Sequence, residues 1–310
     1  MIITVTMNPA IDKTVDLEKF EHGGLNRLKG VISDAGGKGI NVSKTIKALG
    51  QETVVTGFIG GSTGEYINQL LKREGIQSDF VTVSGETRTN IKIVEENGFV
   101  TELNEPGPII SQSEIDVLTE KLMKYADEEA LFVFAGSIPK GVDKNIYQIL
   151  IEKVKERGAK VFLDADGELF VRALEAKPDI IKPNRVELEE YFQIDYRASE
   201  EKLVDMGRQL LKKGIKMVII SLGQMGALFL TDERMVKVPG LKVETHSTVG
   251  AGDAMVAAVS YGVDQKLDFM ECVSLGMAAS AGAVTTHGTK PPALSLIEEL
   301  KTQVRPIDII

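Results

Sequence analysis

The sequence contains a single cysteine, Cys272, among its 310 residues. One cysteine cannot form an intramolecular disulfide, and a chain without disulfides fits a reducing compartment. Cys272 lies in an apolar stretch with helical spacing, where a thiol usually behaves as a small buried side chain. We therefore expect no disulfide and a core position for Cys272.

Positive charge is also scarce, because 36 Lys and Arg stand against 45 Asp and Glu, for a formal net charge of -9. This balance argues against a general surface for nucleic acid or anionic membranes, so an anionic ligand must be held by local groups. The first residues, MIITVTMNPAIDKT, lack the basic segment of a signal peptide, and no later run has the uncharged length of a membrane span. We expect a cytoplasmic protein that binds neither nucleic acid nor membrane.

The established phosphate-binding motifs are missing. The pattern G-x-x-x-x-G-K-[ST] does not occur, and G-x-G-x-x-G fails at Gly250 because Met255 occupies the third glycine position. The V-A-I-K, H-R-D and D-F-G set of protein kinases is absent too. These absences exclude the P-loop, dinucleotide-binding and protein-kinase patterns.

Short strand-like runs alternate with helical patterns along most of the chain. Each run is rich in apolar and β-branched residues, as in strands buried on both faces of a parallel sheet; the runs cover 2–8, 52–60, 130–137, 159–166, 179–184 and 217–223. Between the last two, Leu203, Met206 and Leu210 mark one apolar helix face. This rhythm predicts an α/β fold with a mostly parallel central sheet, whose ligands bind beyond the carboxyl ends of the strands.

Three helix starts are indicated by capping residues. Ser111 with Glu114, and Ser62 with Glu65, have the spacing of a capping box. Asp143 can cap the helical run that stops at Gly158.

Two segments interrupt the alternation. Residues 89–104 read as a hairpin, since Asn97-Gly98 suits a tight turn between β-rich arms. Residues 13–34 contain further short β-prone pieces around the turn-forming HGG. We expect one domain over 1–310, with a small β-sheet lid formed by insertions at about 12–34 and 87–104.

The stretch HSTVGAGDAMVAAVSYGV places Gly250, Ala251, Gly252 and Asp253 at the start of a helix. The first turn of a helix presents free N–H groups and a positive dipole end, and glycines let a phosphate approach closely. An aspartate there would repel the phosphate unless it accepted a proton from an attacking hydroxyl. The alternative is that Asp253 caps the helix and the glycines only turn the chain.

A second glycine cluster, DAGGKGINVSKTIKALG, also precedes a helix. Gly36 and Gly37 open the backbone, Lys38 supplies a cation and Asn41 an amide. This set suits a polyhydroxylated anionic ligand. Alternatively, the glycines shape a loop and Lys38 is solvated.

Eight segments taken together resemble the PfkB branch of the ribokinase-like sugar kinases, in the same order and over nearly the whole chain: NPAID (8–12), AGGKGINV (35–42), GFIGG (57–61), GETRTNIKI (85–93), GSIPKGV (136–142), IKPNRVELE (181–189), ISLGQMGAL (220–228) and STVGAGDAMVA (247–257). The resemblance implies a three-layer α/β/α ribokinase-like fold with a small β-sheet lid. It also implies transfer of the γ-phosphoryl group of ATP, with Mg²⁺, to a sugar hydroxyl.

The resemblance assigns roles to individual residues. Asp253 would be the catalytic base, and the backbone of Gly250, Ala251, Gly252 and Asp253 would form the anion hole. The acceptor sugar would contact Asp12, Gly36, Gly37, Asn41 and Ser137, with Lys38 and Arg88 on its phosphate. ATP would contact Lys182, Asn184, Ser221, Gly223, Gly226, Thr248, Gly250 and Gly252. Glu187 and Asn184 would lie near Mg²⁺, Glu187 acting through water.

The pairing of Lys38 with Arg88 favours a phosphorylated acceptor. Local resemblance favours fructose 1-phosphate, giving fructose 1,6-bisphosphate, and tagatose 6-phosphate, giving tagatose 1,6-bisphosphate, is the alternative. A kinase of an unphosphorylated alcohol would share the mechanism. A sugar-phosphate sensor without catalytic activity is the alternative that is not an enzyme. The expected partners are ATP and a phosphorylated sugar, and we also expect a homodimer formed through the lid.

Overall fold

The computed structural model describes residues 1–286 and 288–309. Its main sheet has the order β15-β14-β13-β12-β11-β10-β9-β1-β4-β5, with β6 also paired to β4. In this spatial order, the strands from β12 through to β5 are parallel to one another, and β13, β14 and β15 form an antiparallel edge next to β12. This confirms the mostly parallel sheet. The strands are β1 Ile2–Thr6, β4 Thr53–Ile59, β5 Gln77–Ser78, β6 Val81–Thr82, β9 Leu131–Ala135, β10 Lys160–Asp164, β11 Ile180–Ile181, β12 Met217–Ser221, β13 Ala227–Leu230, β14 Met235–Val238 and β15 Ile307–Asp308.

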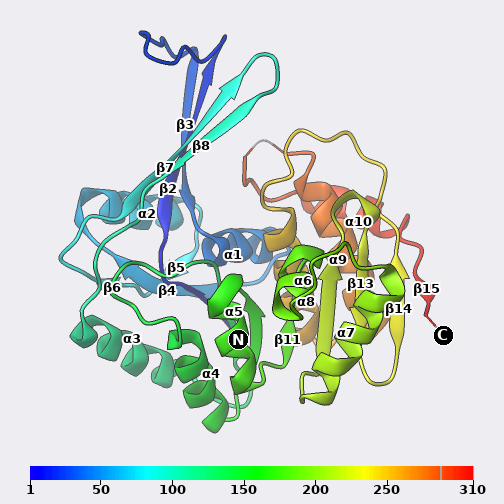
Figure 1. The fold of residues 1–310 in the computed structure, drawn as a ribbon. Helices are drawn as coiled ribbons and strands as arrows, with labels where there is room; N and C mark the ends of the chain where they lie inside the picture. Colours follow the sequence, from blue (N-terminus) through cyan, green and yellow to red (C-terminus); the bar gives the residue numbers. More distant parts are fainter. Residues whose placement is uncertain (287, 310) are drawn as a thin grey trace.

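Helices cover both faces of this sheet (Figure 1). One face packs against α3, α4, α5 and α7, and the other against α1, α8 and α9, with α10 outside α9. The helices are α1 Lys38–Ala48, α2 Gly61–Arg73, α3 Gln112–Tyr125, α4 Ile146–Glu156, α5 Gly167–Ala173, α6 Arg185–Tyr191, α7 Glu200–Lys212, α8 Ala251–Asp264, α9 Phe269–Ala283 and α10 Leu294–Lys301. The three-layer α/β/α architecture is therefore confirmed.

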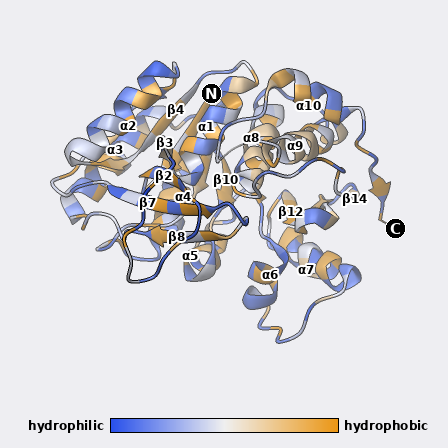
Figure 2. Cartoon of the chain, turned by 90° about the horizontal axis from the view of Figure 1, so that it is seen from above, coloured by the Kyte–Doolittle hydropathy of each residue, from blue (hydrophilic) through white to orange (hydrophobic). Residues whose placement is uncertain are grey.

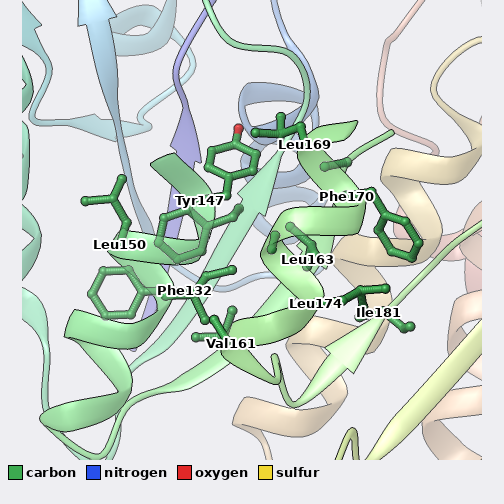
Figure 3. Packing of buried hydrophobic residues seen from close by; sticks show 14 of the residues in the cluster. Phe132, Tyr147, Leu150, Val161, Leu163, Leu169, Phe170, Leu174 and Ile181 are labelled. Carbon is green, nitrogen blue, oxygen red and sulfur yellow. The ribbon is translucent and has the colours of Figure 1, made fainter. Parts of the chain in front are cut away.

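The core forms where the strands meet these helices. In Figure 3, Phe132 and Val161 of the sheet pack with Leu150 of α4, and Tyr147 of the same helix lies beside them. The Tyr147 hydroxyl donates to the carbonyl oxygens of Ala135 and Gly136, so its polar end is satisfied at the end of β9. Outer helices such as α2 show both hydrophobic and hydrophilic colours in Figure 2, as amphipathic helices do.

A separate four-stranded sheet, which we call the lid sheet, projects from the body (Figure 1). Its order is β3-β2-β7-β8. The strands are β2 Ala10–Leu17, β3 Gly30–Gly36, β7 Arg88–Glu95 and β8 Val100–Asn104. These strands fall on the two predicted insertions, and Gly98 of the predicted turn has a positive φ of 87°. The lid sheet therefore joins two segments that are distant in the sequence.

Some predictions of local structure are confirmed and others are wrong. The capping box of Ser111 and Glu114 is present at the start of α3, and Cys272 is buried. The box predicted for Ser62 and Glu65 is wrong, because α2 begins earlier and the distant carboxylate of Glu86 accepts the Thr63 N–H instead. No helix in the described part of the chain has the length and apolarity that crossing a membrane would require.

The cap predicted at Asp143 is also misplaced. Helix α4 starts at Ile146 after Asn145, and the Asp143 carboxylate accepts the N–H of Asn145 in the preceding turn. The predicted stop at Gly158 holds, because this residue has a φ of 87° just beyond the helix.

Candidate active site

Helix α8 begins directly after a left-handed turn at Gly250, whose φ of 83° disfavours residues with a Cβ atom. No side chain among the described residues caps this helix start. The N–H groups of Ala251, Gly252 and Asp253 therefore form an uncapped first turn, which is the part of a helix that binds anions. The Lys182 ammonium adds positive charge, because its Nζ lies 3.3 Å from where a Cβ atom of residue 252 would be.

Asp253 lies in this turn with only 7 % of its surface exposed. Burial, assisted by the negative charge of Asp164, raises the pKa of Asp253 from 3.8 to about 6. The Asn41 side chain donates a hydrogen bond of 2.8 Å to the Asp253 Oδ2 atom. The carboxylate is therefore held in one orientation and has the proton affinity of a general base near neutral pH.

A cavity of about 400 Å³ lies between this turn and the lid sheet, and we call it the acceptor cavity. Among its lining residues are Asp12, Gly37, Lys38, Asn41, Arg88, Ser137, Gly250 and Asp253. Gly36 does not line this cavity, but a Cβ atom at this position would overlap the Asp12 Oδ2 atom. A glycine is therefore required at position 36 for Asp12 to keep its place.

A second cavity of about 320 Å³ lies on the other side of the α8 start, and we call it the nucleotide cavity because the resemblance implies ATP contacts for several of its lining residues. Its polar lining includes Ser221, Gly223, Gly226, Thr248, Ala251 and Gly252. Its apolar lining includes Leu241, Val243, Met255 and Met277, which suit the flat face of a base. Residues 250 and 253 line the acceptor cavity and residues 251 and 252 the nucleotide cavity, so the first turn of α8 separates the two.

Two lysines share one buried carboxylate beside this turn. Asp164, at the end of β10, lies 3.1 Å from the Lys182 ammonium and 3.4 Å from that of Lys38. Burial alone would raise the pKa of Asp164, but the two ammonium groups outweigh it and the pKa is lowered. For Lys38, the charges of Asp164 and Asp253 outweigh burial, and its pKa is raised. Lys38 therefore keeps its positive charge, and it lines the acceptor cavity together with Asp253.

Comparison with known proteins shows which family the chain belongs to. The sequence profile of the family described as "pfkB family carbohydrate kinase" matches residues 5–295. The chain belongs to this carbohydrate kinase family. The resemblance seen in the eight sequence segments is thereby confirmed.

Curated relatives in the pfkB family match along their whole length. The 1-phosphofructokinase of Bacillus subtilis is 36 % identical over 98 % of this chain and 99 % of its own. The D-tagatose-1-phosphate kinase of Bacillus licheniformis is 34 % identical with the same coverage. The structure of Escherichia coli phosphofructokinase-2 in complex with fructose-6-phosphate superposes with a TM-score of 0.91 at 26 % identity, covering 97 % of this chain and 98 % of that one. The chain is therefore similar to sugar-phosphate kinases in sequence and in fold.

The residues around α6 fit the nucleotide-bound divalent metal that pfkB kinases imply. Asn184 and Glu187 form a capping box, in which both carboxylate oxygens of Glu187 accept N–H groups of Asn184. The Asn184 Oδ1 atom in turn accepts the Glu187 backbone N–H, while the Asn184 Nδ2 atom donates to Glu187 Oε1 and so orients the carboxylate. Burial raises the pKa of Glu187. One fixed carboxylate suits hydrated Mg²⁺, which commonly uses one or two protein carboxylates together with phosphates and water.

Asp164 is one of the site residues that sequence reasoning missed. It ends a buried parallel strand, and the carboxyl ends of such strands are where ligands bind in α/β sheets. That position was the available signal. The lysines that it binds are distant in sequence, so their meeting could not be foreseen.

Proposed function

We propose that this pfkB family kinase transfers the γ-phosphoryl group of ATP to fructose 1-phosphate, giving fructose 1,6-bisphosphate and ADP. The observation that carries the proposal is the first turn of α8, which separates an acceptor cavity from a nucleotide cavity and holds Asp253 between them. The 36 % identical relative named 1-phosphofructokinase supports the choice of acceptor. Asp12, Asn41 and Ser137 in the acceptor cavity would bind the sugar hydroxyls.

In the reaction, Asp253 takes the proton from the C6 hydroxyl of fructose 1-phosphate as the hydroxyl oxygen forms a bond to the γ-phosphorus of ATP. The bond from phosphorus to the β,γ-bridging oxygen breaks, and ADP leaves. Developing negative charge on the phosphoryl oxygens is stabilised by the N–H groups of Ala251, Gly252 and Asp253 and by the Lys182 ammonium. Mg²⁺, held near Glu187 with Asn184 orienting that carboxylate, would neutralise charge on the ATP phosphates.

The two cations expected on the acceptor phosphate lie in different parts of the acceptor cavity. Arg88 begins β7 of the lid sheet, and its guanidinium donates to the backbone oxygens of Asn8 and Glu105 at 2.9 and 3.3 Å. Its Nε atom is buried with no hydrogen-bond partner in the described part of the chain. Lys38 faces Asp164 instead. We assign Arg88 to the acceptor phosphate and Lys38 to the phosphoryl group in transfer.

The test is turnover with MgATP in a coupled assay for ADP. The acceptors are fructose 1-phosphate, tagatose 1-phosphate, tagatose 6-phosphate, fructose 6-phosphate and fructose, each reported as kcat/KM. A preference of about tenfold for fructose 1-phosphate, or about 1.4 kcal/mol at the transition state, supports the proposal. Preference for a tagatose phosphate would change the acceptor and keep the mechanism. No turnover with any acceptor would favour a sensor.

We further propose that the protein forms a homodimer through the lid sheet. Apolar side chains are exposed on this sheet and its loops, at Leu25, Leu28, Val31, Phe99, Val100 and Leu103. Apolar side chains gathered on a projecting sheet are typical of an interaction surface. Light scattering coupled to size-exclusion chromatography should give twice the 33.7 kDa mass of one chain. A double variant that carries Leu103→Asp and Phe99→Asp should give the mass of the monomer.

A further inference from the structure

The face of the lid sheet that lines the acceptor cavity carries a regular polar pattern. In the strand register, Asp34 pairs with Asp12, Asp12 with Asn90, and Asn90 with Asn104. All four residues line the acceptor cavity, so they form one polar row across the sheet. Only Asp12 was predicted from the sequence.

The next row on the same face brings an additional cation into the cavity. Lys92 pairs with Thr14 and with Glu102, and all three line the acceptor cavity. Because side chains alternate along a strand, Arg88, Asn90 and Lys92 share one face of β7. Arg88 and Lys92 are four positions apart, about 13 Å along the strand, and their long side chains can reach toward each other from both ends of this span.

Lys92 has a counter-ion that a ligand can replace. Its Nζ lies 3.4 Å from the Glu102 Oε1 atom, and the Glu102 side chain is 48 % exposed while that of Lys92 is 21 % exposed. Ion pairs with an exposed partner are weak, because water solvates the released carboxylate. A phosphate dianion carries more charge than a carboxylate and offers more acceptor oxygens. A phosphate can therefore compete with Glu102 for the Lys92 ammonium.

The electrostatic surroundings of Asp12 place both cations beside the sugar site. Burial raises the pKa of Asp12, while the hydrogen bond from Asn90 and the charges of Lys92 and Arg88 oppose this rise. The field of both cations thus reaches the carboxylate expected to bind a sugar hydroxyl. Lys38 is not this second cation, since it faces Asp164 and the proposed function assigns it to the phosphoryl group in transfer.

We propose that Lys92 is a second cationic ligand for the phosphate of the acceptor, beside Arg88, and that Glu102 competes with that phosphate for the Lys92 ammonium. This inference rests on the proposed function and extends it to acceptor specificity. Lys92 selects phosphorylated over unphosphorylated sugars, and Glu102 sets how tightly a phosphosugar binds. The two side chains therefore act with opposite signs on the same KM.

The test compares Lys92→Met, Lys92→Arg and Glu102→Gln with the wild type. Lys92→Met should raise the KM for fructose 1-phosphate by about tenfold and leave the KM for ATP within about twofold. Its kcat/KM for unphosphorylated fructose should be unchanged. Lys92→Arg should restore the KM, and Glu102→Gln should lower it by about two- to fivefold. The matched control is Lys13→Met, since Lys13 lies on β2 but does not line the cavity.

The outcomes separate this inference from the proposed function. If the wild type does not use fructose 1-phosphate, the proposed function fails, and the variants are compared with whichever phosphosugar the enzyme prefers. An unchanged KM for that phosphosugar in Lys92→Met would overturn the inference. Equal losses with phosphorylated and unphosphorylated sugars would also overturn it, since they would indicate damage to the lid sheet. A raised KM in Glu102→Gln would refute the competition even if Lys92→Met did not fold.

Discussion

Asp253, the proposed catalytic base, should lower the stability of the fold. Its pKa rises from 3.8 to about 6 through burial and the charge of Asp164. At about 1.36 kcal/mol per pKa unit, this rise makes folding about 3 kcal/mol less favourable at pH 8. Asp253→Asn removes the ionisable group and keeps an oxygen that can accept the hydrogen bond from Asn41. The variant should therefore be more stable than the wild type.

The advantage of Asp253→Asn depends on pH in a defined direction. The folded wild type binds its proton more tightly than the unfolded chain does, so wild-type stability recovers as the pH falls from about 6 towards 3.8. The advantage is greatest above the folded pKa and drops to about half at pH 5. For a chain of 310 residues, 3 kcal/mol corresponds to a Tm increase of about 4 to 5 °C.

The measurement is differential scanning calorimetry of both proteins at pH 8 and pH 5, at one scan rate. Asp205→Asn, at an exposed position on α7, serves as the control and should change Tm little at either pH. In the coupled assay, Asp253→Asn should lose about 10²- to 10⁴-fold in kcat. An equal Tm gain at both pH values, or a lower Tm at pH 8, would refute the electrostatic reasoning. Near-normal turnover would refute the role of the base.

Three further predictions follow from the same geometry. The acid limb of the kcat/KM profile should fall about tenfold per pH unit below about pH 6, as Asp253 becomes protonated; a limb centred near pH 4 would contradict the raised pKa. Asp164→Asn should destabilise the protein by about 3 to 5 kcal/mol and raise the KM for ATP, because two lysines lose their shared carboxylate; urea unfolding and ATP titration check both effects. Lys44→Met removes a buried 2.8 Å hydrogen bond to the backbone oxygen of Ala35, the residue before Gly36. It should raise the KM for the acceptor more than that for ATP, and recovery in Lys44→Arg would distinguish positioning from lost volume.

The parts of the fold that depend on local pattern could be predicted from the sequence. Buried parallel strands showed as continuous apolar runs, and the turn at Asn97-Gly98 located the hairpin of the lid sheet. The antiparallel edge of β13 to β15 was not predicted, because β14 and β15 are distant in sequence and β15 has only two residues. The start of α2 was misjudged for a similar reason, since its cap comes from the distant Glu86.

The candidate site shows the same limit. Glycines at Gly36 and Gly250 could be recognised because their positions require a missing Cβ atom or a positive φ. The orientation of the Lys38 side chain could not be predicted, because it depends on the position of Asp164 in the folded chain. The polar row of the lid sheet was also hidden, because a one-residue difference in strand register would turn those side chains to the opposite face.

The division of the site by the first turn of α8 has an evolutionary consequence. In the part of the chain that the structure describes, none of the residues lining the acceptor cavity lines the nucleotide cavity. If the two cavities hold the acceptor and ATP as proposed, substitutions on the lid sheet can therefore change which sugar is accepted without altering the contacts to ATP. A gene duplicate could acquire a new acceptor through a few changes in β2, β7 and β8 while its chemistry stayed intact.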